Sequence, residues 1–400
     1  MRSPPVSQNT IATGVHRSPA EQTILFGAGQ IEAIGREAER LGRERVFIVT
    51  TASVAATPLL ARVRGALGPR AAGEATAMGA HTPLASVAKA AADAIDAGAD
   101  MLVSLGGGSV IDATKCISFA IANGICTQAS IGAWLGRTVT DADLGRRVPH
   151  MAIPTTASAA EFTGLAGVLV PEERTKAALV HPRLAPDIVV HDPTATLHTP
   201  MTLWLSTAIR SLDHAVEALY GPSRNAYTDA LAGEAVRLLF AALPACHASP
   251  EDLEARAAIQ SATWLAGHAA LGAGTSLSHG IGYLLGGLHG VPHGLCSCVT
   301  LPAVMAWNLD ASIEAQARIA RLVRAAGDDT AEDEAARRAA AAVRDLIARL
   351  GLPTRLSDVI ALDDAVRLEL ARLAFSLPHA ASNPRRPTDP GDLEALIASL

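Results

Sequence analysis

Three histidines and one arginine are the residues of this chain whose types and spacing could do chemistry together. Arg210 stands one helical turn before His214, and His279 and His293 follow in a Gly-rich, otherwise apolar stretch that runs to Pro302. Residues four apart on a helix face the same way, so we expect Arg210 and His214 to point into one site. If His279 and His293 join them, three imidazoles converge on one pocket, which is a common way to hold a divalent metal.

The guanidinium beside these imidazoles complicates the expectation of a metal site. Such a site would often be completed by a carboxylate, and a cation beside a divalent metal is electrostatically unfavourable. Asp213 is no obvious substitute, because adjacent residues on a helix point in different directions. A salt bridge from Arg210 to Asp213 or Glu217 is the competing interpretation of the arginine. The sequence leaves both roles of Arg210 open, a structural ion pair and a stand-in for the positive charge of a metal.

The composition excludes several classes of protein. The chain has 400 residues, enough for two domains, and 49% are apolar without any uninterrupted run that approaches the length of a membrane span. The net charge of -6 argues against a nucleic-acid or anionic-membrane partner. The five cysteines include no C-x-x-C pair, which is typical of free thiols in a reducing cytoplasm. We therefore expect a cytoplasmic protein that acts on a small molecule.

The chain divides into two parts with different patterns. Residues 1–20 have no apolar core and are predicted to form a disordered tail, not a signal peptide. Residues 21–196 alternate between strands and helices, which predicts a doubly wound parallel sheet whose ligands bind beyond the carboxyl ends of the strands. The expected strands are 23–26, 45–50, a weaker one around 75, 101–105, 151–153 and 188–190. The connection 122–147 has no assigned structure.

The second part, residues 197–400, is predicted to be all-helical. The expected helices are 200–219, 225–241, 251–271, 312–326, 333–350, 363–374 and a short one from 390. An α/β dinucleotide-binding domain would thus precede a helical catalytic domain. We expect the active site in the cleft between them.

A Gly-Gly-Gly-Ser sequence at 106–109 follows the strand 101–105 and opens a helix at 110–121. Glycines at such a strand end let the backbone approach a phosphate, and the first amides of the helix point at it with the positive end of the helix dipole. A flexible turn explains the same residues less well. A second strand ends in Thr155-Thr156, where two hydroxyls would suit a pyrophosphate or a nicotinamide amide, and a capped turn is the alternative.

Seven short segments, in order across nearly the whole chain after the tail, resemble the iron-containing (group III) alcohol dehydrogenase family. They are most similar to its maleylacetate reductase branch. The segments are Phe26-Gly27-Ala28-Gly29, Ala80-His81-Thr82-Pro83, Gly106-Gly107-Gly108-Ser109, Ile153-Pro154-Thr155-Thr156, His214-Ala215-Val216-Glu217-Ala218-Leu219-Tyr220, Pro292-His293-Gly294 and Asn383-Pro384-Arg385. The resemblance implies the dehydroquinate synthase-like two-domain fold and reversible hydride transfer between NAD or NADP and a carbonyl or alcohol. It also implies a homodimer. In the maleylacetate reductase branch the substrate is a 4-oxo-hexenedioate.

The resemblance also assigns residues to the cofactor. The matching cofactor-binding positions are Gly106, Gly107, Ser109, Thr155 and Thr156. Asp112 and Lys115 lie on the helix after the glycines, where a role in the cleft and a solvated i,i+3 pair are both open. Thr51 stands where many NAD-preferring members carry Asp, so repulsion of a 2′-phosphate is weaker and NADP becomes admissible.

The metal positions of the family fall on Arg210, His214, His279 and His293, so three histidines match and the aspartate does not. If a metal binds, these three histidines would be its ligands. Maleylacetate reductases also look different at the aspartate, and its absence favours that branch or a metal-free relative. Tyr283 stands where the family commonly has a proton-relaying His, and it serves either as a proton donor or as a packed aromatic.

We therefore expect an NAD(P)H-dependent reductase of the maleylacetate reductase type, acting without a metal on a carbonyl or polarised alkene of a small oxo-acid. Arg210 would stabilise the developing oxyanion or clamp a substrate carboxylate, and His214, His279 or Tyr283 would supply the proton. Two alternatives are a biosynthetic enzyme with altered or non-redox chemistry on this scaffold, and a catalytically silent NAD(P)-binding protein. His81 is expected to serve local structure, and His289 to line the cleft mouth.

Overall fold

Parallel strands form the sheet of the N-terminal half in a computed structural model, which describes residues 21–170 and 175–400. The expected tail, 1–20, lies outside the described residues. The sheet order is β1-β8-β5-β4-β2-β3, and every pairing is parallel. The strands are β1 Thr23–Phe26, β2 Val46–Thr50, β3 Ala71–Ala75, β4 Met101–Gly106, β5 His150–Pro154 and β8 Ile188–His191. All residues of the central strands β2, β4, β5 and β8 are buried, as expected of strands covered on both faces.

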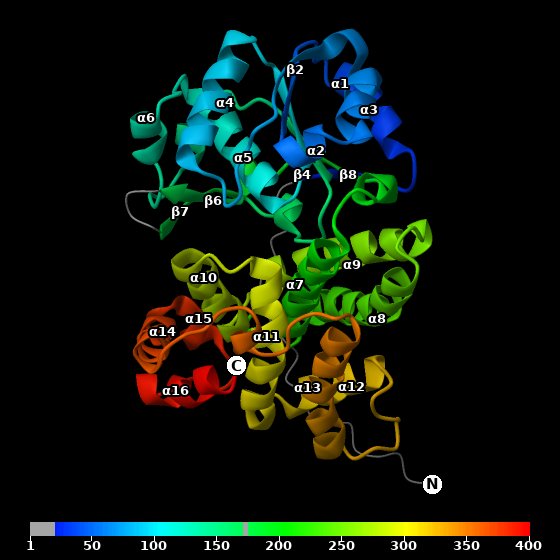
Figure 1. Cartoon of the computed structure of the whole chain (residues 1–400), viewed down its shortest axis with the longest axis vertical. Coiled ribbons are helices and arrows are strands. Elements are labelled where there is room, and N and C mark those ends of the chain that lie inside the picture. The colour runs from blue at the N-terminus through cyan, green and yellow to red at the C-terminus, as the bar shows by residue number, and fades with distance from the viewer. Residues whose placement is uncertain (1–20, 171–174) are drawn as a thin grey trace.

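Helices cover the sheet on both sides (Figure 1). On one side, α1 (Ile34–Arg40) and α3 (Pro58–Leu67) pack on alternate residues such as Ile48 and Val103. On the other side, α4 (Leu84–Asp96) and α5 (Gly108–Asn123) pack on Phe47, Val49 and Leu102. Side chains of a strand alternate between its faces, so one apolar run supplies both cores. The predicted doubly wound sheet is confirmed.

Four elements of this half were not predicted. The strands β6 (Leu165–Val170) and β7 (Thr175–Val180) form a separate antiparallel pair, and the short helices α2 (Ala52–Ala55) and α6 (Gln128–Gly132) lie in connections. Both strands of the pair contain Ala, and β6 contains Gly, so neither shows a clear strand composition. The pair matters because residues of both strands line the cavity described below.

The C-terminal half is all-helical in the described residues, as predicted, and lies below the sheet in Figure 1. Its helices are α7 Met201–Leu219, α8 Ala226–Ala248, α9 Leu253–Ala273, α10 Leu277–His289, α11 His293–Trp307, α12 Ile313–Leu322, α13 Glu332–Arg349, α14 Asp364–Ser376, α15 Pro378–Ser382 and α16 Pro390–Ala398. Helix α7 is buried along almost its whole length and packs against α8, α9 and α11. It is the central helix of this half.

One described helix, α8, has the length and apolar composition that could cross a membrane. It packs against α7 and α9 and contributes Val236, Leu239 and Leu243 to the helical core. These contacts are those of a core helix.

Candidate active site

A cavity of about 1040 Å³ lies between the two halves of the chain, and both halves supply its walls. The sheet half contributes the ends of β2 and β4, the 79–82 turn, the 156–160 segment and the β6–β7 pair. The helical half contributes one face of α7, one face of α10 and the start of α11. The cavity is therefore at the carboxyl ends of the parallel strands, where this class of sheet binds its ligands.

The glycines after β4 bring the backbone close to the end of β5. A Cβ on Gly107 would come within 3.0 Å of the Thr156 side chain, and one on Gly108 within 3.1 Å of Ser158 Oγ. Helix α5 begins at Gly108, so its first amides open into the cavity beside Ser109. A long helix that starts at bare backbone is suited to a pyrophosphate.

Not every predicted cofactor residue reaches the cavity. Gly107, Ser109 and Thr156 line it, whereas Gly106 and Thr155 do not. Thr155 is buried, and its carbonyl accepts a hydrogen bond of 2.8 Å from Thr199 Oγ1. Gly106 packs against Val110, where a Cβ would approach the valine side chain to 2.7 Å. These two residues lie outside the cavity and pack beneath the rest of the glycine loop 106–109.

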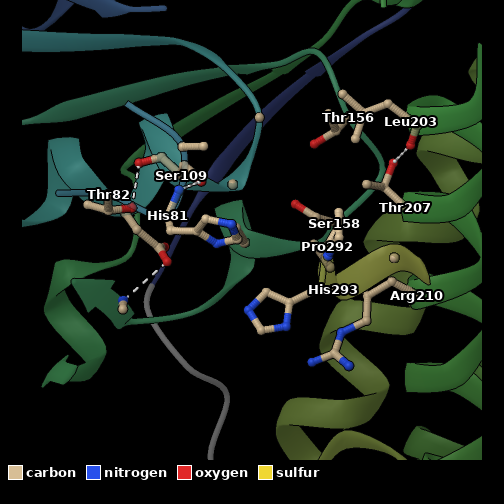
Figure 2. A pocket seen from close by; sticks show the side chains of 18 of the residues that line it. His81, Thr82, Ser109, Thr156, Ser158, Leu203, Thr207, Arg210, Pro292 and His293 are labelled. Atoms are coloured by element: carbon tan, nitrogen blue, oxygen red, sulfur yellow. Dashed lines mark hydrogen bonds between the residues drawn. The ribbon is translucent and has the colours of Figure 1, made fainter. Parts of the chain in front are cut away.

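The Ala-His-Thr-Pro turn holds the glycine loop in place. His81 and Thr82 both have left-handed φ angles, 61° and 58°, which is costly for residues other than glycine. The amide of His81 donates to Ser109 Oγ (3.2 Å), and Thr82 Oγ1 donates to the Ser109 carbonyl (3.0 Å). Figure 2 shows His81 across the cavity from His293 and Arg210. His81 thus serves local structure, as predicted, and also lines the cavity.

Lys115 is fully buried, so the possibility of a solvated pair with Asp112 was wrong. Its Nζ donates to Asp112 Oδ1 (3.0 Å) and to the carbonyls of Ala160 (2.8 Å) and Leu165 (2.7 Å). A buried ammonium is tolerated when its hydrogen bonds are satisfied in this way. Asp112 lines the cavity, and its other oxygen accepts from the amide of Gly167. The pair fixes the segment that forms one cavity wall.

Thr51 lines the cavity at the end of β2, beside Ser53. Its Oγ1 caps α2 by accepting from the amide of Val54 (3.2 Å) and lies 2.9 Å from Ser53 Oγ. Two neutral hydroxyls therefore lie together at this end of β2.

Arg210 and His214 lie on the same face of α7 and both line the cavity, which is the arrangement that their spacing predicts. Arg210 Nη1 donates to Ser297 Oγ (3.3 Å) and lies 3.8 Å from Asp213 Oδ2. The guanidinium carbon lies 5.3 Å from the centre of the Tyr283 ring, within cation–π range. The ion pair, one of the two roles that the sequence left open, is present, and Arg210 also lines the cavity as expected.

His279 does not line the cavity but lies behind His214, with 4.5 Å between the ring centres. Its Nδ1 lies 2.8 Å from Glu217 Oε2 and 3.4 Å from Asp213 Oδ2, and all three side chains are buried. Asp213 Oδ2 also accepts from Ser297 Oγ (2.7 Å) and Ser278 Oγ (3.0 Å). Asp213 therefore takes part in the site, which its sequence position beside His214 did not lead us to expect.

These contacts set the charges of the cluster. Burial and the neighbouring Arg210 act to lower the pKa of His279, but Asp213 and Glu217 outweigh them, so the pKa is raised above its ordinary value. Burial, then His279 and Arg210, hold the pKa of His214 well below its ordinary value. Burial raises the pKa of Asp213, but His279 and Arg210 reverse this and the pKa is lowered. The charged form is therefore favoured at His279 and disfavoured at His214, which lies in front of it.

Tyr283 is surrounded by rings. Its ring centre lies 5.9 Å from His293, 5.5 Å from His379 and 6.5 Å from His279, each in an edge-to-face arrangement. Tyr283 and His293 line the cavity. His379, on α15, was not anticipated, because only the packing of α15 on α10 brings it here. His289, which we expected at the cleft mouth, is not among the described residues that line the cavity.

The donor set around Arg210 is only partly that of a divalent-metal site. His214 Nδ1 and His279 Nε2 are buried without hydrogen-bond partners, so part of a ligand set is present. Among the described residues, however, the one group whose ligand atoms lie within 4.8 Å of one another is Asp213, Glu217 and His279, not the three histidines. Both oxygens of Glu217 and Oδ2 of Asp213 already accept hydrogen bonds, whereas Oδ1 of Asp213 is buried without one. Arg210 lies where a carboxylate is needed.

Comparison with known sequences divides the chain into the same two parts. A sequence family described as iron-containing alcohol dehydrogenase matches residues 21–193, and one described as the C-terminal part of the Fe-containing alcohol dehydrogenase family matches residues 204–399. The chain belongs to the iron-containing alcohol dehydrogenase family. The family resemblance seen in the sequence is confirmed, and the chain is an NAD(P)-dependent oxidoreductase.

The relatives include both alcohol dehydrogenases and maleylacetate reductases. An NAD-dependent methanol dehydrogenase from Bacillus methanolicus is 31% identical over 90% of this chain and 93% of its own length. A maleylacetate reductase from Rhizobium sp. is 32% identical over 84% of this chain and 85% of its own length. Among solved structures, a maleylacetate reductase from Agrobacterium tumefaciens has a TM-score of 0.80 at 28% identity, covering 97% of this chain and 98% of its own. The maleylacetate reductases among these relatives support that branch of the family.

Proposed function

We propose that this chain is a cytoplasmic, homodimeric NAD(P)H-dependent reductase of the maleylacetate reductase type. Its substrate would be a small oxo-acid, reduced at a carbonyl or at a polarised alkene without the help of a metal. The observation that carries the proposal is Arg210, a guanidinium that lines the cavity at the position where the family has a metal-binding aspartate. The similarity to maleylacetate reductases supports the substrate class.

The cofactor would be held along the sheet half of the cavity. The bare backbone at Gly107 and Gly108, with the first amides of α5, would bind the pyrophosphate. Thr156 and Ser158 offer hydroxyls at the adjoining strand end, and Thr51 stands where the adenosine ribose would be read. When bound, the reduced nicotinamide supplies the hydride. We expect both NADH and NADPH to be accepted, because a hydroxyl and not a carboxylate is at Thr51.

Arg210 would provide the positive charge that the reaction needs. Its Nη1 is committed to Ser297 and Asp213, and its guanidinium also borders the cavity. A fixed guanidinium can bind a substrate carboxylate in a fork or stabilise the oxyanion that develops when a carbonyl is reduced. Because the cavity is partly closed and apolar, water screens this charge weakly. The guanidinium is already in place, so little rearrangement of solvent is needed as negative charge develops on the substrate.

The proton would come from Tyr283 or from the histidines around it. The Tyr283 ring is packed among His293, His379 and Arg210 and half-exposed toward the cavity. Its phenolic hydroxyl can donate a proton to a substrate held beside it. His214 is neutral in this site, so it can pass a proton but not act as the resting acid.

The test combines metal analysis with cofactor turnover. The protein is purified without chelators, its iron and zinc are measured by mass spectrometry, and oxidation of NADH and NADPH is followed at 340 nm with 4-oxo-2-hexenedioate and related oxo-acids. We expect less than stoichiometric metal and oxidation that survives dialysis against EDTA. Stoichiometric iron or zinc, with activity lost on chelation, would contradict the metal-free part of the proposal. Nucleotide binding without turnover of any oxo-acid would contradict the reductase itself.

A further inference from the structure

Exposed apolar side chains gather in the cavity. Leu203, Tyr283 and Leu288 leave 42%, 42% and 44% of their surfaces uncovered, and all three line the helical half. Most large apolar side chains of the described residues are buried, because exposing them to water is unfavourable. An exposed apolar surface inside a cavity is typical of a ligand-binding wall.

One face of α10 builds this wall. Tyr283 and Leu284 line the cavity, and so do Gly287 and Leu288, which follow them at helical spacing. A Cβ added to Gly287 would meet no atom within 4 Å. The missing side chain therefore leaves open space beside Leu284 and Leu288, which we call the slot.

Charge is distributed very unevenly along the cavity. Arg210 is the one fixed cation among the described side chains that line it, and it lies in the helical half. The one fixed carboxylate among them, Asp112, belongs to the sheet half, where it is paired with Lys115. The helical half thus offers one anion-binding group and an apolar slot.

Taking the proposed reductase function as the starting point, we infer that the substrate carries one carboxylate, bound at Arg210, and an apolar tail that lies along Leu284, Gly287 and Leu288. A second carboxylate in the slot would lose its hydration against leucines without gaining a partner, which is strongly unfavourable. The preferred substrate is then a 4-oxo-2-alkenoate with an alkyl end and not a dicarboxylate. Its reduction consumes one NAD(P)H and one proton and converts the C=C bond to a single bond.

A matched pair of substrates tests the inference directly. 4-Oxo-2-hexenoate and 4-oxo-2-hexenedioate have the same six-carbon chain and differ in a terminal methyl against a terminal carboxylate. We expect kcat/KM to be at least about tenfold higher for the monoacid, because the burial of an unpaired charge is costly. Lengthening the tail from six to eight carbons should raise kcat/KM about fourfold per methylene while the slot is filled.

Gly287 gives the corresponding variant. Gly287→Val places a branched side chain in the slot at a position where a Cβ meets no protein atom within 4 Å. Gly287→Ala serves as the control for the change in helix propensity. We expect the valine variant to lose the gain from longer tails while its affinity for NAD+ is unchanged. A chain-length preference that survives in Gly287→Val would place the tail elsewhere and overturn the inference.

Binding without turnover separates this inference from the proposed function. Hexanoate and adipate, which cannot be reduced, are titrated calorimetrically into the complex with NAD+. Tighter binding of hexanoate supports the single-anion subsite, even if no oxo-acid is turned over and the reductase proposal fails. Equal or tighter binding of adipate, or equal turnover of the dicarboxylate, overturns the inference and leaves the reductase proposal standing.

Discussion

Glu217 is the residue whose replacement tests the buried cluster most sharply. Its Oε1 accepts from Ser276 Oγ (2.7 Å) and the Ser278 amide (2.8 Å), and its Oε2 accepts from the Ser276 amide (2.7 Å) and lies 2.8 Å from His279 Nδ1. Ser276 is the N-cap of α10 without a side-chain cap of its own, so Glu217 on α7 caps that helix from outside. The same carboxylate holds the ring of His279.

The magnitude follows from these four contacts. Glu217→Gln preserves the shape but replaces one acceptor oxygen by an NH₂ group, which must face two donors whichever way the amide turns. A buried donor left unsatisfied costs about 1–3 kcal/mol, and removing one charge of a buried pair costs about 3–5 kcal/mol. We therefore expect Glu217→Gln to lower the free energy of unfolding by about 3–5 kcal/mol.

The cluster also makes stability depend on pH. Burial and Arg210 lower the pKa of His279, yet Asp213 and Glu217 raise it above its ordinary value of 6.5, so this histidine stabilises the fold fully below pH 6.5. That contribution is lost as the pH rises through the folded-state pKa. Without the charge of Glu217 the pKa of His279 is raised less, so the stability of Glu217→Gln should fall less steeply above pH 6.5.

Urea unfolding at pH 6, 7, 8 and 9 measures both effects. Glu234→Gln is the matched control, because Glu234 is exposed and pairs with Arg237 on the surface of α8, where such pairs contribute about 0–1 kcal/mol. A Glu217→Gln protein as stable as the control, with the same pH slope as the unmodified chain, would refute the described role of the carboxylate.

Three further outcomes are expected. Lys115→Met should destabilise the sheet half by about 3 kcal/mol, because it leaves two buried carbonyls and a carboxylate without their hydrogen-bond donor. Lys89→Met, on the surface of α4, is the control and should change the stability by less than about 0.5 kcal/mol. Thermal unfolding of both variants measures the difference. Gly107→Ala should weaken NADH binding at least about tenfold, since its Cβ would press on Thr156 at 3.0 Å and displace the loop, and fluorescence titration that finds an unchanged Kd would contradict it. Arg210→Asp recreates the Asp-x-x-x-His spacing and should bind one zinc or iron per chain by mass spectrometry, whereas Arg210→Asn, which lacks the charge, should bind less.

Much of the architecture follows from patterns that act within one element. Buried strands alternating with helices predict a doubly wound sheet, because an apolar run covered on both faces must lie between layers of helices. The spacing of Arg210 and His214 places both on one face of α7, and glycines at a strand end place bare backbone where a phosphate binds. These inferences need no knowledge of how the elements pack.

The arrangement of the site depended on contacts between elements. The spacing along α7 does not show that His279 lies behind His214. Nor does it show that Asp213 and two serines lie beside His279, or that His379 contacts Tyr283. The sequence allowed Lys115 to be solvated, because nothing in it shows that the loop carrying Ala160 packs over this side chain. Helical periodicity determines only which side chains of one helix point the same way, and does not determine which side chains of other helices they meet. The partner of a buried charge is chosen by packing across the chain, where satisfying every desolvated donor and acceptor decides which side chains meet.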